Sequence, residues 1–287
     1  MRVLLAVDGS EVSQEAARAC QHLTYPDELI VLHTVQVPRL AYPATTPGMH
    51  KEFSVAIEQA MKEEGQQTLD RLRALLPANL PSVSARLETG SPAEVILSQA
   101  DAMKADLIVL GSRGLGQIQE WALGSVSHRI TAHATCATWV VKAPLPQLQH
   151  VLTPVDSPED AEAVVAFFAK KPLRQTVTVT VLHVVPFMEP VRRVGIFMPE
   201  EFRKELVVQG EKCANEVAAR LSKLGYSTKS IAVVGLPSVA ILEKASAVNA
   251  DLIAMRSHSR GAISRFFIGS VSHAVLHQAK CSVLLIR

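Results

Sequence analysis

Short apolar runs alternate with longer amphipathic stretches along the whole chain. The first run, Val3–Val7, is apolar at every position, which is typical of a parallel strand covered on both faces. Ser10 then predicts the N-cap of a helix over about residues 11–23. The same alternation predicts strands at 29–35, 83–87, 107–110 and 138–141, and helices at about 50–76, 92–103 and 125–134.

This alternating order of strands and helices predicts a five-stranded parallel sheet with right-handed crossovers. The second half of the chain repeats the order. Its strands are predicted near 151–154, 177–185, 229–234, 251–255 and 282–286. We therefore expect two doubly wound α/β domains in one chain.

The repeat is also visible in the residues themselves. Gly-Ser-Val-Ser-His at 124–128 returns at 269–273, and Ala-Asp-Leu-Ile at 105–108 returns at 250–253. A period this long is far from that of a solenoid protein and indicates a duplicated domain. Pro144 and Pro146 favour an extended linker between the copies. We expect the domains to cover residues 1–143 and 150–287.

Composition excludes several classes of protein. With 287 residues, 48% hydrophobic residues and a mean hydropathy of +0.20, the chain can bury two cores, which excludes a disordered protein. The 29 basic and 27 acidic residues leave a formal charge of only +2 without a basic run, so we expect no nucleic-acid partner. No apolar run approaches the length of ~18 residues that spans a membrane, and the N-terminal apolar stretch is too short for a signal peptide.

The four cysteines are too far apart in the sequence to form a CxxC metal or redox motif. We expect reduced, mostly buried thiols and a cytoplasmic protein. HxH and HExxH spacings are also absent from the sequence, so no metal site is predicted. His33 and His183, which recur at the end of the second strand of each half, are interpreted as structural residues near a pocket.

In a doubly wound sheet, ligands bind outside the carboxyl ends of the strands. The most informative segment there is the loop after the fourth strand, which contains Gly111, Gly114 and Gly124. Glycines let backbone N–H groups approach a ligand, and the helix that opens at Gly124-Ser125 offers a positive dipole end to an anion. The spacing is neither that of a P-loop nor that of the dinucleotide fingerprint. A phosphate cradle is one interpretation; the other is that these glycines only make turns.

The loop Gly111-x2-Gly114-x9-Gly124-Ser125 resembles the nucleotide-binding motif G-x2-G-x9-G-[S/T] of the universal stress protein family. The resemblance extends over both halves of the chain. It implies two five-stranded α/β sandwich domains, adenine nucleotide alpha hydrolase-like in fold, packed as a pseudo-dimer through their last strands. It also implies a bound ATP, ADP or AMP, with or without Mg²⁺.

The same resemblance assigns roles within the first half. Asp8 resembles the acid that lies near the adenosine, and Thr34 the position whose backbone holds the edge of the adenine. Arg113, inside the loop, meets either phosphate charge or solvent. The positions that resemble the phosphate-binding residues are Gly111, Gly114, Gly124, Ser125 and Val126.

The second half departs from the motif. Asp156 and Val184 stand where Asp8 and Thr34 stand, but Arg256 and Ser259 replace the first two glycines, and only Gly269 and Ser270 remain. In one hypothesis this degenerate site is empty, with Arg256 filling the space of the phosphate. In the other, Arg256 and Arg260 bind an anion through their guanidinium groups.

The resulting functional prediction is a cytoplasmic stress-response protein that binds an adenine nucleotide in its first domain and acts as a switch or sensor. A slow ATPase or nucleotidyl-transfer enzyme on the same fold is the second hypothesis, and a scaffold without nucleotide is the third. No catalytic residue is predicted, because the motif supplies no base or Mg²⁺-binding carboxylate beyond Asp8. A protein partner of unknown identity and a further homodimer remain open.

Overall fold

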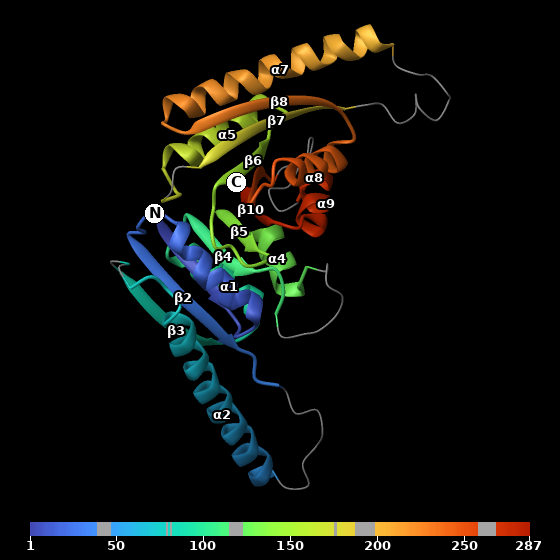
Figure 1. Cartoon of the computed structure of the whole chain (residues 1–287). Helices are drawn as coiled ribbons and strands as arrows, with labels where there is room; N and C mark the ends of the chain where they lie inside the picture. The colour runs from blue at the N-terminus through green and yellow to red at the C-terminus, as the bar shows by residue number, and fades with distance from the viewer. Residues whose placement is uncertain are drawn as a thin grey trace. The chain divides into compact units, whose positions relative to one another are not determined.

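The computed structural model describes residues 1–38, 47–78, 80, 82–114, 123–174, 177–186, 199–257 and 268–287 (Figure 1). The chain forms two compact units. The first consists of Met1–Gln21 and Tyr25–Val141, and the second of His22–Thr24 and Lys142–Arg287.

The first unit is a five-stranded parallel sheet in the order β3-β2-β1-β4-β5. Helices α1 and α2 contact each other and the sheet, as do α3 and α4, so the sheet is covered on both faces. The strands are β1 (Arg2–Val7), β2 (Glu28–Val35), β3 (Val83–Thr89), β4 (Leu107–Gly111) and β5 (Ala137–Val141). The helices are α1 (Glu11–Ala19), followed by a 3₁₀ turn (Cys20–His22), α2 (Pro47–Arg73), α3 (Pro92–Ala102) and α4 (Ser125–His133).

The second unit repeats this arrangement, with five parallel strands in the order β10-β9-β6-β7-β8. Its strands are β6 (His150–Pro154), β7 (Thr178–Pro186), β8 (Ser227–Gly235), β9 (Leu252–Arg256) and β10 (Ser282–Ile286). Its helices are α5 (Pro158–Ala169), α7 (Glu200–Lys223), α8 (Pro237–Ala247) and α9 (Ser270–Gln278).

Burial explains why the central strands form. Val3, Leu4 and Leu5 of β1 have no exposed surface, and neither do Val151 and Leu152 of β6. Successive residues of a strand point to opposite faces, so a strand buried at every position has a packed layer on each side. The fold class predicted from the apolar runs, two doubly wound α/β domains in tandem, is confirmed.

Helix ends differ from the prediction by a few residues. The first helix was expected to reach residue 23, but α1 ends at Ala19 because the chain tightens into a 3₁₀ turn there. The long helix of the first unit lies three residues earlier than expected, at Pro47–Arg73 rather than 50–76. Periodicity fixes the buried face of a helix better than its ends, which depend on local capping.

The two longest helices are amphipathic rather than uniformly apolar. Helix α2 has 27 residues and α7 has 24. Helix α7 buries Ala214, Val217 and Leu221 and packs on β7 and β8, while Phe202 near its start is exposed. Within the described part of the chain, no helix has the continuous apolar length that crossing a membrane requires.

The thiols should differ sharply in reactivity. All four cysteines are free; Cys213 is exposed, whereas burial raises the pKa of Cys20 to about 12 and that of Cys281 to about 11. The thiolate is the reactive form, so these two groups stay protonated at about pH 8. We expect iodoacetamide to label Cys213 first and to leave Cys20 unmodified, as read by peptide mass spectrometry. Labelling of Cys20 in the folded chain as fast as in urea would contradict this.

Candidate functional site

A cavity of about 420 Å³ lies at the carboxyl ends of the strands of the first unit. Strand β1 pairs with β2 on one side and with β4 on the other, and the register places Val7 beside His33 and Ala6 beside Leu110. The crossovers therefore diverge at β1, which is where an open α/β sheet forms its crevice. All eight residues predicted for this site line the cavity: Asp8, Thr34, Gly111, Arg113, Gly114, Gly124, Ser125 and Val126.

The cavity also has walls that the motif does not include. Ser13 comes from the first turn of α1, and Pro92 and Ile96 from the start of α3. None of these three residues was predicted as a site residue, although Pro92 was expected at the start of a helix. The N-terminal ends of the helices that follow β1 and β3 necessarily lie near the strand ends, and this signal could have identified them.

Ser10 holds the Asp8 carboxylate in place. Its hydroxyl donates to Asp8 Oδ1 at 2.6 Å, and its backbone N–H donates to the same oxygen at 3.0 Å. The Ser10 hydroxyl oxygen also accepts from the backbone N–H of Ser13 at 3.2 Å, which is the N-cap bond of α1. Asp8 Oδ2 lies on the other side, against Gly114, where an added Cβ would stand only 2.4 Å from it. The carboxylate is therefore fixed, and the glycine leaves room for it.

The start of α4 forms the opposite wall. Gly124 is its N-cap residue, with φ −64° and ψ 153°, and makes no side-chain cap to the first turn. The Gly124 N–H donates to the Ser112 carbonyl at 2.8 Å, and the Ser127 hydroxyl donates to the Gly111 carbonyl at 2.8 Å. These bonds tie the helix start to the end of β4. Among the described residues, the N-cap supplies no side-chain acceptor for the N–H groups of the first turn, which lie at the positive end of the helix dipole.

The two strand-end histidines have structural hydrogen bonds. His33 Nδ1 lies 2.8 Å from the Val7 carbonyl oxygen, and His183 Nδ1 lies 2.9 Å from that of Val155. A carbonyl only accepts, so Nδ1 carries the hydrogen in both rings. Each ring also packs where a long helix has a glycine, since a Cβ on Gly65 or Gly210 would stand 3.1 or 3.0 Å from the ring Cδ2. Each histidine thus joins two strands beneath a helix.

The second unit has an equivalent cavity of about 340 Å³. It is formed by the ends of β6, β7 and β9 and by the starts of α5, α8 and α9. Of the residues predicted for the degenerate site, five line it: Asp156, Val184, Arg256, Gly269 and Ser270. Ser259 lies outside the described residues, as does Arg260.

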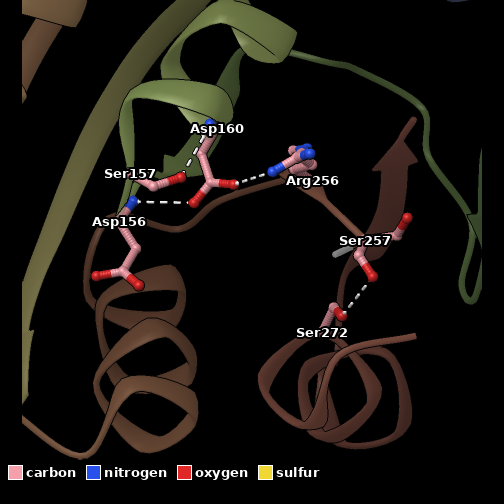
Figure 2. A network of polar contacts seen from close by, with 6 residues as sticks. All are labelled: Asp156, Ser157, Asp160, Arg256, Ser257 and Ser272. Atoms are coloured by element: carbon pink, nitrogen blue, oxygen red, sulfur yellow. Dashed lines mark hydrogen bonds and ion pairs between the residues drawn. The ribbon is translucent and has the colours of Figure 1, made fainter. Parts of the chain in front are cut away.

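Arg256 stands at the position of Gly111 and forms an ion pair (Figure 2). Its Nη1 is 3.3 Å from Asp160 Oδ1, and the two side chains are only 23% and 21% exposed. Asp160 Oδ2 accepts from the Asp156 backbone N–H at 3.2 Å, and the Asp160 N–H donates to the Ser157 hydroxyl at 3.2 Å. In Figure 2 the Asp156 carboxylate points away from this pair. The arginine is therefore neutralised by a carboxylate that is itself anchored.

Asp160 was not predicted as a site residue from the sequence. The chain is one residue shorter between Asp156 and the N-cap Ser157 than between Asp8 and the N-cap Ser10. The third helical position is consequently Ser13 in α1 and Asp160 in α5, because each donates its N–H to the N-cap hydroxyl. Aligning the two N-caps, rather than the two aspartates, would have set Asp160 opposite Ser13. The carboxyl of neighbouring Glu159 has a lowered pKa, first from its own backbone N–H, then from Ser157 and from the charge of Arg256.

Fold and cavities together define a tandem α/β protein in which each unit holds a ligand-sized hollow at its strand ends. The chain belongs to the universal stress protein family. The model of that family matches it twice, over residues 1–142 and 147–287.

Relatives cover either the whole chain or one half. Universal stress protein Rv2005c of Mycobacterium tuberculosis is 26% identical over 299 residues, covering 99% of this chain and 96% of its own. Universal stress protein YxiE of Bacillus subtilis is 30% identical over 145 residues, which is 49% of this chain and 98% of its own. A crystal structure of a universal stress protein from Archaeoglobus fulgidus is 19% identical, with a TM-score of 0.67, and covers 99% of this chain and 97% of its own. That likeness shows the shared fold.

Proposed function

We propose that the first unit binds an adenine nucleotide (ATP, ADP or AMP) and that the protein acts as a nucleotide-dependent switch or sensor in a stress response. The observation that supports this most directly is the composition of the first cavity. It combines an anchored carboxylate, a glycine-lined wall and the open start of α4 in one hollow of about 420 Å³. The four free thiols support a reducing compartment such as the cytoplasm.

The residues present fit such a ligand. The Thr34 side-chain oxygen is buried and has no hydrogen-bond partner among the described residues, so a ligand at the cavity can supply one. Val7, Leu110 and Ile96 provide an apolar surface for a planar base. A Cβ at Gly114 would collide with Asp8, and one at Gly111 would stand 3.0–3.1 Å from the α1 backbone. Glycine at these two positions therefore lets the loop backbone lie close to Asp8 and to α1.

Each part of the cavity has a role in this proposal. The ionised Asp8 carboxylate only accepts hydrogen bonds, which suits the hydroxyl groups of a ribose. The N–H groups at the start of α4 and the Ser125 hydroxyl suit the phosphates, whose charge the helix dipole favours. A Mg²⁺ ion, when bound with ATP, would neutralise part of the phosphate charge. Ser10 keeps the carboxylate oriented toward the ligand.

Slow hydrolysis or transfer of a nucleotidyl group is the second candidate. Asp8 is the carboxylate among the described residues that line the first cavity, and Ser10 already occupies its Oδ1. A second group that could orient a water molecule is not found among those lining residues. We therefore favour nucleotide binding over nucleotide turnover as the function of the first unit.

The test is to denature the purified chain gently, identify any released nucleotide by mass and count it. About one adenine nucleotide per chain, or about one site on titration with Mg-ATP, is the expected result. If no nucleotide is released and none binds on titration, the proposal is overturned and a scaffold without nucleotide is favoured. Steady release of phosphate or pyrophosphate from bound ATP would identify the enzyme instead.

Ser10→Ala should weaken both the helix and the site. Loss of the N-cap costs about 1 kcal/mol of stability, and the Asp8 carboxylate loses its strongest hydrogen bond. We expect nucleotide affinity to fall about 3- to 10-fold, measured by calorimetry. Ser157→Ala removes the matching cap of α5 in the second unit and serves as the control. Affinity that drops equally in both variants would show that Ser10 acts through stability alone.

A further inference from the structure

The second cavity keeps one half of the first cavity and changes the other. Its nucleoside half, defined as Asp156, Val184, Pro237 and Ile241, comes from the same elements as Asp8, Thr34, Pro92 and Ile96. The aspartate, the proline at the helix start and the isoleucine one turn later are identical in the two cavities. Valine in place of threonine replaces a hydroxyl with a methyl group. These residues retain a surface for a base and a sugar.

The other half of the cavity is altered at two contacting positions. Gly111 and Ser13 of the first unit become Arg256 and Asp160, which form the ion pair of Figure 2. The start of α9 itself is unchanged, with Gly269 at φ −63° and ψ 154° as N-cap. The backbone N–H groups that could bind an anion are thus retained. The ion-paired side chains of Arg256 and Asp160 occupy the positions at which the first unit has only Gly111 and Ser13.

The charges around the altered part of the second cavity determine whether a phosphate group can bind there. Among the described residues, Asp156, Asp160 and Arg256 are the charged side chains that line the second cavity, and their formal charges sum to −1. The described charged side chains of the first cavity, Asp8 and Arg113, sum to zero. Glu159, which precedes Asp160 in the chain and is exposed, carries a further negative charge that interacts with Arg256. A phosphate would have to displace Asp160 from Arg256 and then remain next to the released carboxylate. An uncharged ligand neither needs to displace Asp160 nor is repelled by its carboxylate.

We propose that the second cavity binds an uncharged nucleoside and excludes the nucleotide that the first cavity takes, an inference that rests on the proposed function of the first unit. Asp156 accepts from the sugar hydroxyls, and the base packs between Val184 and Ile241. The Arg256–Asp160 pair closes the space that phosphates would need. The two units then report on different forms of the same molecule, one with phosphates and one without.

The first measurement uses the wild-type chain, with adenosine and ATP as probes in calorimetric titrations. ATP should bind at about one site per chain. Adenosine added to the ATP-saturated protein should bind at about one further site, with little change in the ATP already bound. Two ATP sites in the wild-type chain, or no adenosine binding beside saturating ATP, would overturn the inference.

The second measurement changes the pair. Asp160→Asn removes one negative charge and releases Arg256 from its ionic partner, so ATP should gain a second site, with affinity raised by about tenfold or more. Glu162→Gln is the matched control, because it makes the same change on the same helix in a carboxylate that pairs with Arg220 and does not line the cavity. ATP stoichiometry that stays the same in a folded Asp160→Asn chain, or rises equally in both variants, would count against the ion pair as the barrier.

The outcomes separate the two proposals. If ATP binds once and adenosine finds no further site, the function proposed for the first unit stands and the nucleoside site is rejected. If neither probe binds at all, the proposed function is itself rejected. Because the wild-type titrations need no variant, the inference remains testable even if Asp160→Asn fails to fold.

Discussion

Gly124→Asp should abolish nucleotide binding by the first unit and leave the fold intact. Gly124 has ordinary N-cap dihedral angles, and an added Cβ would come no closer than 3.4 Å to an atom of the described residues. Aspartate is among the best N-cap residues, so its carboxylate should accept from the N–H groups at the start of α4. Those are the groups that the phosphates need, and the new charge repels them. We expect affinity to fall by about 100-fold or more while the melting temperature stays equal or rises.

Two further variants make this result specific. Gly124→Ala adds only the Cβ and should keep most of the affinity, at a cost of about 1 kcal/mol or less in stability. Gly269→Asp makes the same change at the N-cap of α9, whose dihedral angles match, and should leave ATP binding by the first unit unchanged. Calorimetry with ATP and thermal unfolding of all three chains provide the readout. Wild-type affinity in Gly124→Asp would show that the phosphates lie elsewhere.

Phe168→Ala should produce the largest loss of stability that we predict. The Phe168 side chain is fully buried in α5, and its ring meets that of Tyr226 edge-on at a centroid distance of 5.2 Å. Replacing it removes apolar contacts and leaves a cavity, which costs about 3–5 kcal/mol. The Tyr226 hydroxyl donates to the Phe168 backbone carbonyl at 3.0 Å, a bond that the substitution does not itself remove.

Phe167→Ala is the natural control, because it deletes the same side chain one position earlier, where the phenylalanine is only half-buried. We expect Phe167→Ala to cost about 1 kcal/mol, because Phe167 buries less apolar surface on folding than Phe168 does. Urea denaturation followed by circular dichroism measures both. Equal losses in the two variants would mean that burial in α5 does not determine its stability.

The sequence predicted the sheet well because the sheet is set by burial. Strands such as β4 and β5 are buried at every position, and an apolar run records this directly. The spacing of Gly111, Gly114 and Gly124 likewise identified one wall of a cavity, since glycine marks where backbone must come close to something else. These signals are local in the chain and need no knowledge of packing.

The rest of the candidate sites depends on contacts between distant segments. Asp160 and Arg256 are 96 positions apart, and their pairing follows from a one-residue difference at the start of α5. The hold of Ser10 on Asp8 is short-range, but two bonds to one carboxylate oxygen follow from the turn geometry rather than from residue type. Such contacts can be identified only from the three-dimensional positions of the side chains.

The Arg256–Asp160 pair also bears on how the two halves of the chain diverged after duplication. Glycine and serine in one unit, and arginine and aspartate in the other, are each self-consistent combinations. A chain with only one residue exchanged carries an uncompensated charge in a mostly buried position, which lowers its stability. The residues at positions 160 and 256 should therefore change together among related chains, because an exchange at one position alone breaks the pair.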